Sequence, residues 1–233
     1  MPKTLIATSA VTAAERGAAT VSAAAAALFA MLLVGLHVVQ PELDPTWRFV
    51  SEYALGPAGW MMTTAFIALA VSQITAVVAL ARHVRTWPGR IGLALLVLAA
   101  VGLLVAAAFP TDPITTPVAA QTTDGRLHNL GASLDWSPVG MLLLAVSLGR
   151  TTTWRSWRPR LLVAAAVPCL LTLAFTAAAV AAGGHYGPGT YAGLVGRLML
   201  LSYLGWFLTV ARAIRTPPRT TSDVFSSGEP VLA

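Results

Sequence analysis

The feature that most constrains this chain is a series of six long apolar stretches, each bounded by charged or turn-forming residues. They cover residues 18–39, 59–81, 91–109, 130–148, 161–182 and 191–211. A helix needs about 20 apolar residues to cross a hydrocarbon layer of about 30 Å. Lipid-facing backbone must be helical or closed into a barrel, and the sequence lacks barrel-like alternation. The sequence therefore predicts an all-α integral membrane protein, with a bundle of six transmembrane helices in one domain over residues 18–211.

Composition excludes the main soluble alternatives. Charged residues make up 10% of the 233 residues, whereas a soluble domain has about 25%. A single cysteine, Cys169, excludes a disulfide framework and a four-cysteine zinc site. The net charge of +6 comes from arginines scattered over short connections, which indicates the positive-inside effect and no nucleic-acid partner.

The basic residues also predict an orientation. Twelve of the 15 lie before the first span, between spans two and three, between spans four and five, or after span six. That side is expected to be cytoplasmic, with both termini on it, in a multi-pass protein of the cell membrane. Residues 1–17 would form a cytoplasmic N-terminus. Residues 212–233, rich in Pro and Ser, would form a disordered cytoplasmic tail.

Most residues capable of acid–base chemistry are expected on the opposite side. If the fourth span is one helix from about Asp124, then Asp124, His128 and Asp135 lie within an arc of about 40°. Asp135 would lie about 10 Å deeper than His128, where a carboxylate costs about 2.5 to 3.5 kcal/mol. Arg197 is the natural counter-ion for Asp135, and such a pair would either serve a site or merely lock two helices together.

Four residues are the candidate catalytic groups: Asp112, Glu52, His128 and Asp135. Asp112 lies between Pro110 and Pro113, whose fixed φ angles stiffen the backbone around it. Solvated loop acids would give the same pattern without any chemistry.

Aromatic residues and Arg197 form a candidate substrate-binding set. This set is Trp47, Tyr53, Trp60, Phe109, Trp136, Tyr186 and Arg197. Aromatic rings beside a buried acid can stabilise a carbocation by about 0.5 to 2 kcal/mol each. An interfacial aromatic belt is the alternative explanation for most of them.

A metal site is a second possibility for the same side of the protein. Its ligands would be His37, His128, His185 and Asp112, with an open position for water. No two of these histidines share a short ligand spacing, and His37 is equally explained as an interhelical hydrogen-bonding residue.

Three segments resemble the bacterial six-helix membrane proteins grouped as domain-of-unknown-function family 998. They are SEYALGPAGW (51–60), FPTDP (109–113) and TTDGRLHNLGA (122–132), and the resemblance extends over residues 20–212. It implies a membrane fold but no activity. On that pattern Ser51, Glu52, Tyr53, Asp112, Gly125 and His128 match motif positions. The chain is also similar to membrane-bound terpene cyclases in its size and in having acids at membrane level.

These observations favour a membrane-embedded enzyme that acts on an amphiphilic lipid or isoprenoid substrate. The most concrete form is a terpene cyclase that closes a linear isoprenoid by acid catalysis, without a cofactor or metal. One alternative is a metal-dependent lipid hydrolase. Another is a non-enzymatic transporter or structural membrane protein in which the acids and Arg197 form an ion-coupled gate.

Overall fold

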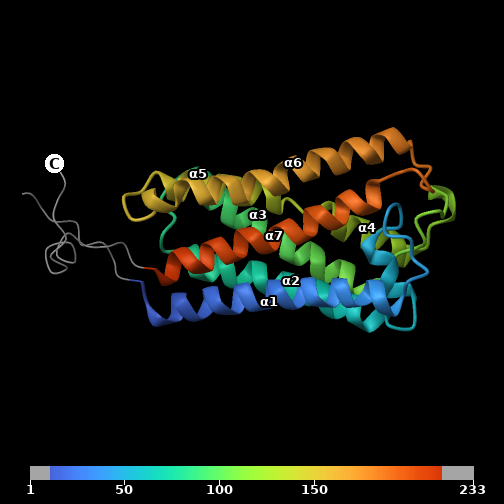
Figure 1. Cartoon of the computed structure of the whole chain (residues 1–233), viewed down its shortest axis with the longest axis horizontal. Coiled ribbons are helices and arrows are strands. Elements are labelled where there is room, and N and C mark those ends of the chain that lie inside the picture. The colour runs from blue at the N-terminus through green and yellow to red at the C-terminus, as the bar shows by residue number, and fades with distance from the viewer. Residues whose placement is uncertain (1–10, 217–233) are drawn as a thin grey trace, which may run out of the picture.

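The computed structural model describes residues 11–216 as a bundle of long helices (Figure 1). The α-helices are α1 (Ala13–Val39), α2 (Gly59–Leu80), α3 (Trp87–Ala108), α4 (Thr123–Ser133), α5 (Ser137–Gly149), α6 (Arg158–Ala182) and α7 (Ala192–Arg215). Short 3-10 helices lie in the connections: η1 (Val50–Leu55), η2 (Val118–Ala120) and η3 (Arg155–Trp157). With α4 and α5 taken together, six segments are long and apolar enough to cross a membrane. The predicted all-helical, multi-pass membrane fold is confirmed.

The helices form a closed ring. α1 packs against α2 and α7, α2 against α3, α3 against α5, α5 against α6, and α6 against α7. α4 lies beside α3 and packs extensively against no other helix among the described residues. α1 begins and α7 ends at one end of the bundle, here called the terminal end (Figure 1). The opposite end, here called the distal end, carries the connections 40–58, 109–122 and 183–191.

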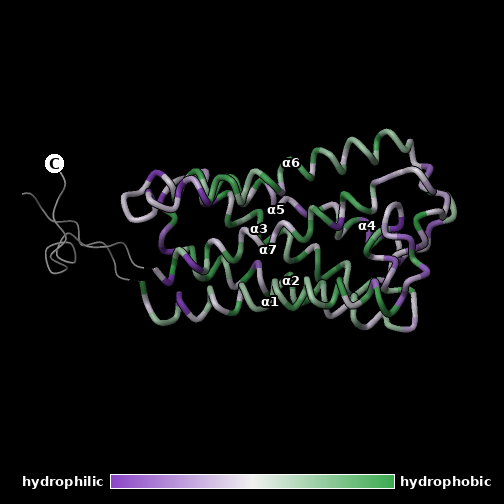
Figure 2. The backbone as a smooth tube through the Cα atoms, in the orientation of Figure 1, coloured by the Kyte–Doolittle hydropathy of each residue, from purple (hydrophilic) through white to green (hydrophobic). Residues whose placement is uncertain are grey.

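Hydropathy differs between the middle of the bundle and its two ends. The middle of the bundle is coloured mainly as hydrophobic, and the hydrophilic segments gather at its two ends (Figure 2). Large apolar side chains such as Val163, Leu170 and Leu173 on α6 are exposed, as expected for helices that face lipid. The predicted placement of residues 1–10 and 217–233 lies outside the described residues.

The fourth span differs from its prediction as one continuous helix. α4 ends at Ser133 and α5 begins at Ser137, so the chain breaks at residues 134–136. Pro138 lies in the first turn of α5. In a continuous helix, a proline lacks the N–H that would bond to the carbonyl four residues earlier, and its ring clashes with that carbonyl. Asp135 accepts a hydrogen bond from the Ser137 amide at 3.2 Å and so satisfies one of the amides left free. The predicted continuous stripe of Asp124, His128 and Asp135 is therefore wrong.

Glycines allow α3 to approach α4 and α5 at backbone contact. A Cβ added to Gly102 or Gly131 would overlap the carbonyl of the other residue, and Gly92 and Gly140 face each other in the same way. Close contact between small residues is a common way for helices to associate in membranes. These contacts fix the positions of α4 and α5 on either side of the break.

Candidate functional site

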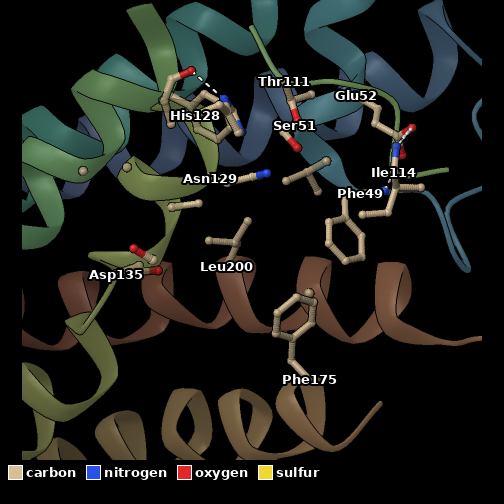
Figure 3. A pocket seen from close by; sticks show the side chains of 18 of the residues that line it. Phe49, Ser51, Glu52, Thr111, Ile114, His128, Asn129, Asp135, Phe175 and Leu200 are labelled. Atoms are coloured by element: carbon tan, nitrogen blue, oxygen red, sulfur yellow. Dashed lines mark hydrogen bonds between the residues drawn. The ribbon is translucent and has the colours of Figure 1, made fainter. Parts of the chain in front are cut away.

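A cavity of about 460 Å³ occupies the distal half of the bundle, between the α3–α4 pair and the α6–α7 pair. Its walls are largely apolar and include three phenylalanines, Phe49, Phe66 and Phe175. η1 and residues 111–114 lie over it at the distal end (Figure 3). The volume falls within the range of about 300 to 1,000 Å³ that is usual for small-molecule sites.

Part of the cavity lining on α4 and α6 is exposed at the surface of the bundle. The lining includes Asn129, Ala132 and Ser133 of α4 and Thr172 and Thr176 of α6. The three α4 residues and Thr176 are exposed, and α4 and α6 do not pack extensively against each other.

All four candidate catalytic residues, Glu52, Asp112, His128 and Asp135, line this cavity. They come from η1, from the connection after α3, from α4 and from the α4–α5 break. The structure thus brings together residues that are up to 83 positions apart in the sequence. Their hydrogen bonds, however, separate them into different roles.

Glu52 connects two distal loops. Its carboxylate accepts hydrogen bonds from the Phe49 amide at 2.8 Å and from the Ile114 amide at 3.0 Å. It also forms an ion pair with Arg48 at 2.7 Å, and only 2% of the residue is exposed. The dashed line in Figure 3 marks the bond between Glu52 and Ile114. Through these three donors Glu52 holds η1 against the connection after α3.

Asp112 holds the start of α4. Its two carboxylate oxygens accept hydrogen bonds from the amide and the hydroxyl of Thr122, at 2.8 and 3.0 Å. Thr122 is in turn the N-cap of α4 and accepts a hydrogen bond from the Gly125 amide. A side chain at Gly125 would overlap the Asp112 carboxylate, which explains a glycine at this position. The aimed carboxylate predicted between Pro110 and Pro113 is present, and its partner is the helix cap.

His128 presents a proton acceptor to the cavity. Its Nδ1 lies 3.0 Å from the carbonyl oxygen of Ala106 and 2.9 Å from that of Phe109. Because carbonyl oxygens only accept, Nδ1 donates to them, and Nε2 is the ring nitrogen that remains to accept a proton. The residue is 3% exposed, and no described residue donates to Nε2. Phe66 packs beside the ring, with 6.0 Å between the ring centroids.

Asp135 lies at the α4–α5 break and lines the cavity (Figure 3). The Tyr203 hydroxyl donates to its Oδ2 at 2.8 Å, and the Ser137 amide donates to Oδ1. The predicted pairing with Arg197 is wrong, because the ion pairs of the described residues do not include it. Arg197 lies two turns before Tyr203 on α7, nearer the distal end, and so it is out of reach of the break.

Arg197 instead anchors the first distal loop. Its guanidinium donates to His37 Nε2 at 2.8 Å and to the carbonyls of Pro45, Arg48 and Gly193. His37 Nδ1 lies 2.7 Å from the Leu33 carbonyl, so His37 is an interhelical hydrogen-bonding residue.

The loop itself is shaped by Asp44. Its carboxylate accepts from the hydroxyl of Thr46 at 2.6 Å and from the amide of Thr46 at 2.9 Å, and the hydroxyl bond is the main cause of the lowered pKa of Asp44. The Thr46 carbonyl then accepts from the Leu194 amide at 3.0 Å, which ties the loop to the start of α7.

None of the seven predicted substrate-binding residues lines the cavity. Trp60 and Trp136 are 66% and 53% exposed, as expected for an interfacial aromatic belt, and they do not line the cavity. Trp47 stacks against Arg48, and Tyr53 packs in the core beside His37 and Arg197. Phe109 contributes only its carbonyl, to His128, and Tyr186 lies behind Phe49 at 5.1 Å between ring centroids.

The four alternative metal ligands are not assembled. No group of three or more His, Cys, Asp or Glu side chains within residues 11–216 is arranged to hold a metal ion. His37 binds Arg197, His128 faces two carbonyls, and Asp112 binds Thr122. His185 is exposed in the connection before α7, where its Nδ1 lies near the Gly183 carbonyl.

Sequence reasoning missed several lining residues. Phe66 and Phe175 lie inside uniformly apolar spans, where nothing distinguishes a cavity-facing ring from one that packs in the core. Asn129 had a detectable signal, because it is a polar residue next to His128 near the start of a span. Its side chain lines the cavity and makes no hydrogen bond to another described residue (Figure 3).

Comparison with known proteins gives one match. A family model described as "Protein of unknown function (DUF998)" matches residues 23–213. No curated protein and no solved structure matches the chain. The matched region spans almost the entire helical bundle, including every residue of the cavity.

Proposed function

Since the chain belongs to the DUF998 family, whose description gives no activity, we propose a function from the geometry of its cavity. The protein is a membrane-embedded enzyme that acts on an amphiphilic lipid or isoprenoid. One observation carries this proposal: three carboxylic acids and a histidine from four segments line a single cavity with largely apolar walls. We place it in the cell membrane, with both termini in the cytoplasm, from the distribution of basic residues.

The reaction that fits these groups best is acid-catalysed cyclisation of a linear isoprenoid. Asp135 takes up a proton and gives it to a terminal alkene or epoxide, and a ring closes onto the cationic carbon. His128 Nε2 takes a proton from the final cation, which leaves an alkene. One proton enters the substrate and one leaves, so the product is an isomer and no co-reactant is consumed. General acid–base catalysis of this kind contributes about 10² to 10⁴-fold.

The walls of the cavity suit a cationic intermediate. Phe49, Phe66 and Phe175 offer aromatic faces or edges around the space, in place of the tryptophans and tyrosines proposed from the sequence. The Tyr203 hydroxyl orients the Asp135 carboxyl, and the carbonyls of Ala106 and Phe109 orient the His128 ring. Groups whose own partners hold them in place are what catalysis requires.

Glu52 and Asp112 have a different role in this proposal. Their oxygens are occupied by donors from Arg48, Phe49, Ile114 and Thr122. They are therefore positioning residues that close the distal end of the cavity and place His128. The metal-dependent hydrolase is not proposed, because its four ligands are not brought together.

Direct assay of cyclisation tests the proposal. Purified protein in lipid nanodiscs would be incubated with linear C15 and C20 isoprenoid alcohols and their terminal epoxides, and products of unchanged mass would be sought by gas chromatography and mass spectrometry. Asp135→Asn and His128→Asn should each lower the rate by about a hundredfold or more. His128→Asn retains an N–H toward the α3 carbonyls. Asp124→Asn, at an exposed position of α4, is the matched control.

Two results would contradict the enzyme proposal. Full activity of both variants would remove Asp135 and His128 from the chemistry. Tight binding of these compounds without conversion of any of them would favour a protein that carries or senses a lipid. That second reading is the transporter or structural alternative.

A further inference from the structure

The charges around the cavity are all of one sign. Glu52, Asp112 and Asp135 line it, whereas no lysine or arginine does. Only Glu52 has a cationic partner, Arg48, and the donors to Asp112 and Asp135 are uncharged hydroxyl and amide groups. Two carboxylates therefore face the cavity without a compensating cation among the described residues.

The nearby arginines cannot supply that charge. Arg197 is 3% exposed and donates to His37 and three backbone carbonyls. Arg48 is held by Glu52. Arg126 is exposed on α4 and is not among the residues that line the cavity.

The cavity's free polar groups are uncharged. The Asn129 amide and the Ser51 hydroxyl line it and make no side-chain hydrogen bond to another described residue (Figure 3). His128, which is nine-tenths buried, offers an unpartnered Nε2. Together they can accept and donate hydrogen bonds to a hydroxyl, carbonyl or epoxide oxygen.

We infer that this cavity selects an amphiphile with an uncharged polar head and rejects one with a phosphate or diphosphate head. This rests on the proposed function, because it assumes that the cavity is the substrate site. Phosphate recognition in proteins uses Arg, Lys, a metal ion or a helix N-terminus. Here an anionic head would lie beside Asp112 and Asp135, with no cation in the cavity lining to offset the repulsion between like charges. The substrate class is therefore a free isoprenoid alcohol, ether, carbonyl or epoxide, and not a prenyl diphosphate.

Three ligands with the same tail test this inference: geranylgeraniol, geranylgeranyl diphosphate and a geranylgeranyl dimethylamine. The protein would be held in nanodiscs of zwitterionic phosphatidylcholine, so that the bilayer itself carries no net charge. A diazirine derivative of geranylgeraniol would be photo-crosslinked, and the modified peptides would be mapped by mass spectrometry. We expect modification of α4, α6 and α7 around the cavity. Geranylgeraniol and the amine should compete with the probe, and the diphosphate should compete about a hundredfold less well.

Two variants test which residues cause the discrimination between the alcohol and the diphosphate. Asp112→Asn with Asp135→Asn should reduce the difference between the alcohol and the diphosphate by at least about tenfold. Arg126→Gln, outside the cavity, should leave that difference unchanged. The wild-type ligand series gives a result even if the double variant does not fold.

Several outcomes overturn the inference. Equal competition by the diphosphate and the alcohol would show that the cavity does not select by charge. Loss of diphosphate binding in Arg126→Gln would show that an anionic head is recognised beside α4. Crosslinks only outside the cavity would overturn the inference and also the site of the proposed function. Charge selection at the cavity without any cyclised product would support the inference and contradict only the enzyme proposal.

Discussion

The Tyr203 hydroxyl of α7 donates a 2.8 Å hydrogen bond to Asp135, which lies where the fourth span breaks into two helices. Tyr203 is fully buried, so the bond joins two sides of the cavity across the interior. This contact replaces the Asp135–Arg197 pair that the sequence suggests. The position of the Asp135 side chain therefore depends on a neutral hydrogen-bond donor.

Removing this hydrogen bond should destabilise the bundle. We expect Tyr203→Phe to lower the free energy of unfolding by about 1 kcal/mol, because a buried carboxylate oxygen loses its donor. Thermal unfolding of the purified protein in detergent measures the effect. Tyr191→Phe is the control, since Tyr191 is exposed and donates to no described residue. Equal melting temperatures for the two variants would contradict the role given to Tyr203.

Glu52 should matter for folding as well as for activity. Glu52→Gln weakens the bonds to Arg48 and to the Phe49 and Ile114 amides, and we expect a loss of about 1 to 3 kcal/mol of stability. Glu42→Gln, at an exposed position of the same connection, should have little effect. Thermal unfolding of both variants measures the difference in their stability. A fully stable but inactive Glu52→Gln protein would instead place Glu52 in proton transfer.

Gly125 should not tolerate a side chain. Gly125→Ala puts a Cβ into the Asp112 carboxylate, and we expect about 1 to 3 kcal/mol of destabilisation and a displaced start of α4. Gly17→Ala on α1 is a matched control, because its added Cβ would meet no atom within 4 Å. Hydrogen exchange of the α4 amides, measured by mass spectrometry, should rise in the first variant and not in the second.

The free energy of unfolding should depend on pH through His83, which lies at the terminal end of the bundle. Burial lowers the pKa of His83, against the opposing effect of Glu15 at 3.7 Å, while Arg82 and Arg85 lower it further. The unfolded chain therefore binds a proton at a higher pH than the folded protein does. Stability should be highest above the usual pKa of about 6.5 and should fall as the pH drops below it.

Melting temperatures between pH 8 and pH 5 test this dependence on His83. His83→Gln should flatten the acid side of the profile. His185→Gln, changed at an exposed position of the distal end, should keep the wild-type slope. A wild-type slope in His83→Gln would assign the effect to another group.

The orientation can be tested by cysteine labelling in intact cells, in a background with Cys169 replaced by Ala. Cysteines placed at positions 45, 118 and 187, in the three distal connections, should react with an impermeant maleimide. Cysteines at positions 86 and 155, near the terminal end, should stay protected until the cells are lysed. The reverse pattern would place the distal end, and with it the cavity, on the cytoplasmic side.

The sequence predicts the spans well because apolar length is a local property. It does not locate the break, because residues 134–136 lie inside one apolar window and Pro138 is also compatible with a kinked continuous helix. It identifies Asp135 as buried and unusual, but not its partner. Arg197 and Tyr203 are both on α7, and only the depth of α7 relative to α5 decides which of them reaches Asp135.

The sequence predicts only part of the candidate site. Acids and a histidine are rare in membrane segments, so Asp135 and His128 stand out in the sequence. Aromatic residues at span ends are common, and their side chains face either lipid or protein according to the rotation of the helix. Trp60 and Trp136 face outward, whereas Phe175 faces the cavity, and composition alone does not separate these cases.

If a ligand enters the cavity between α4 and α6, its head group and its tail contribute differently to its affinity. A hydrocarbon tail that moves sideways from the bilayer exchanges one apolar environment for another, so water is not released and chain length adds little driving force. Discrimination then falls on the head group, which exchanges interfacial water for Asn129, Ser51 and His128. Affinity for such a ligand should accordingly depend on its mole fraction in the membrane and not on its aqueous concentration.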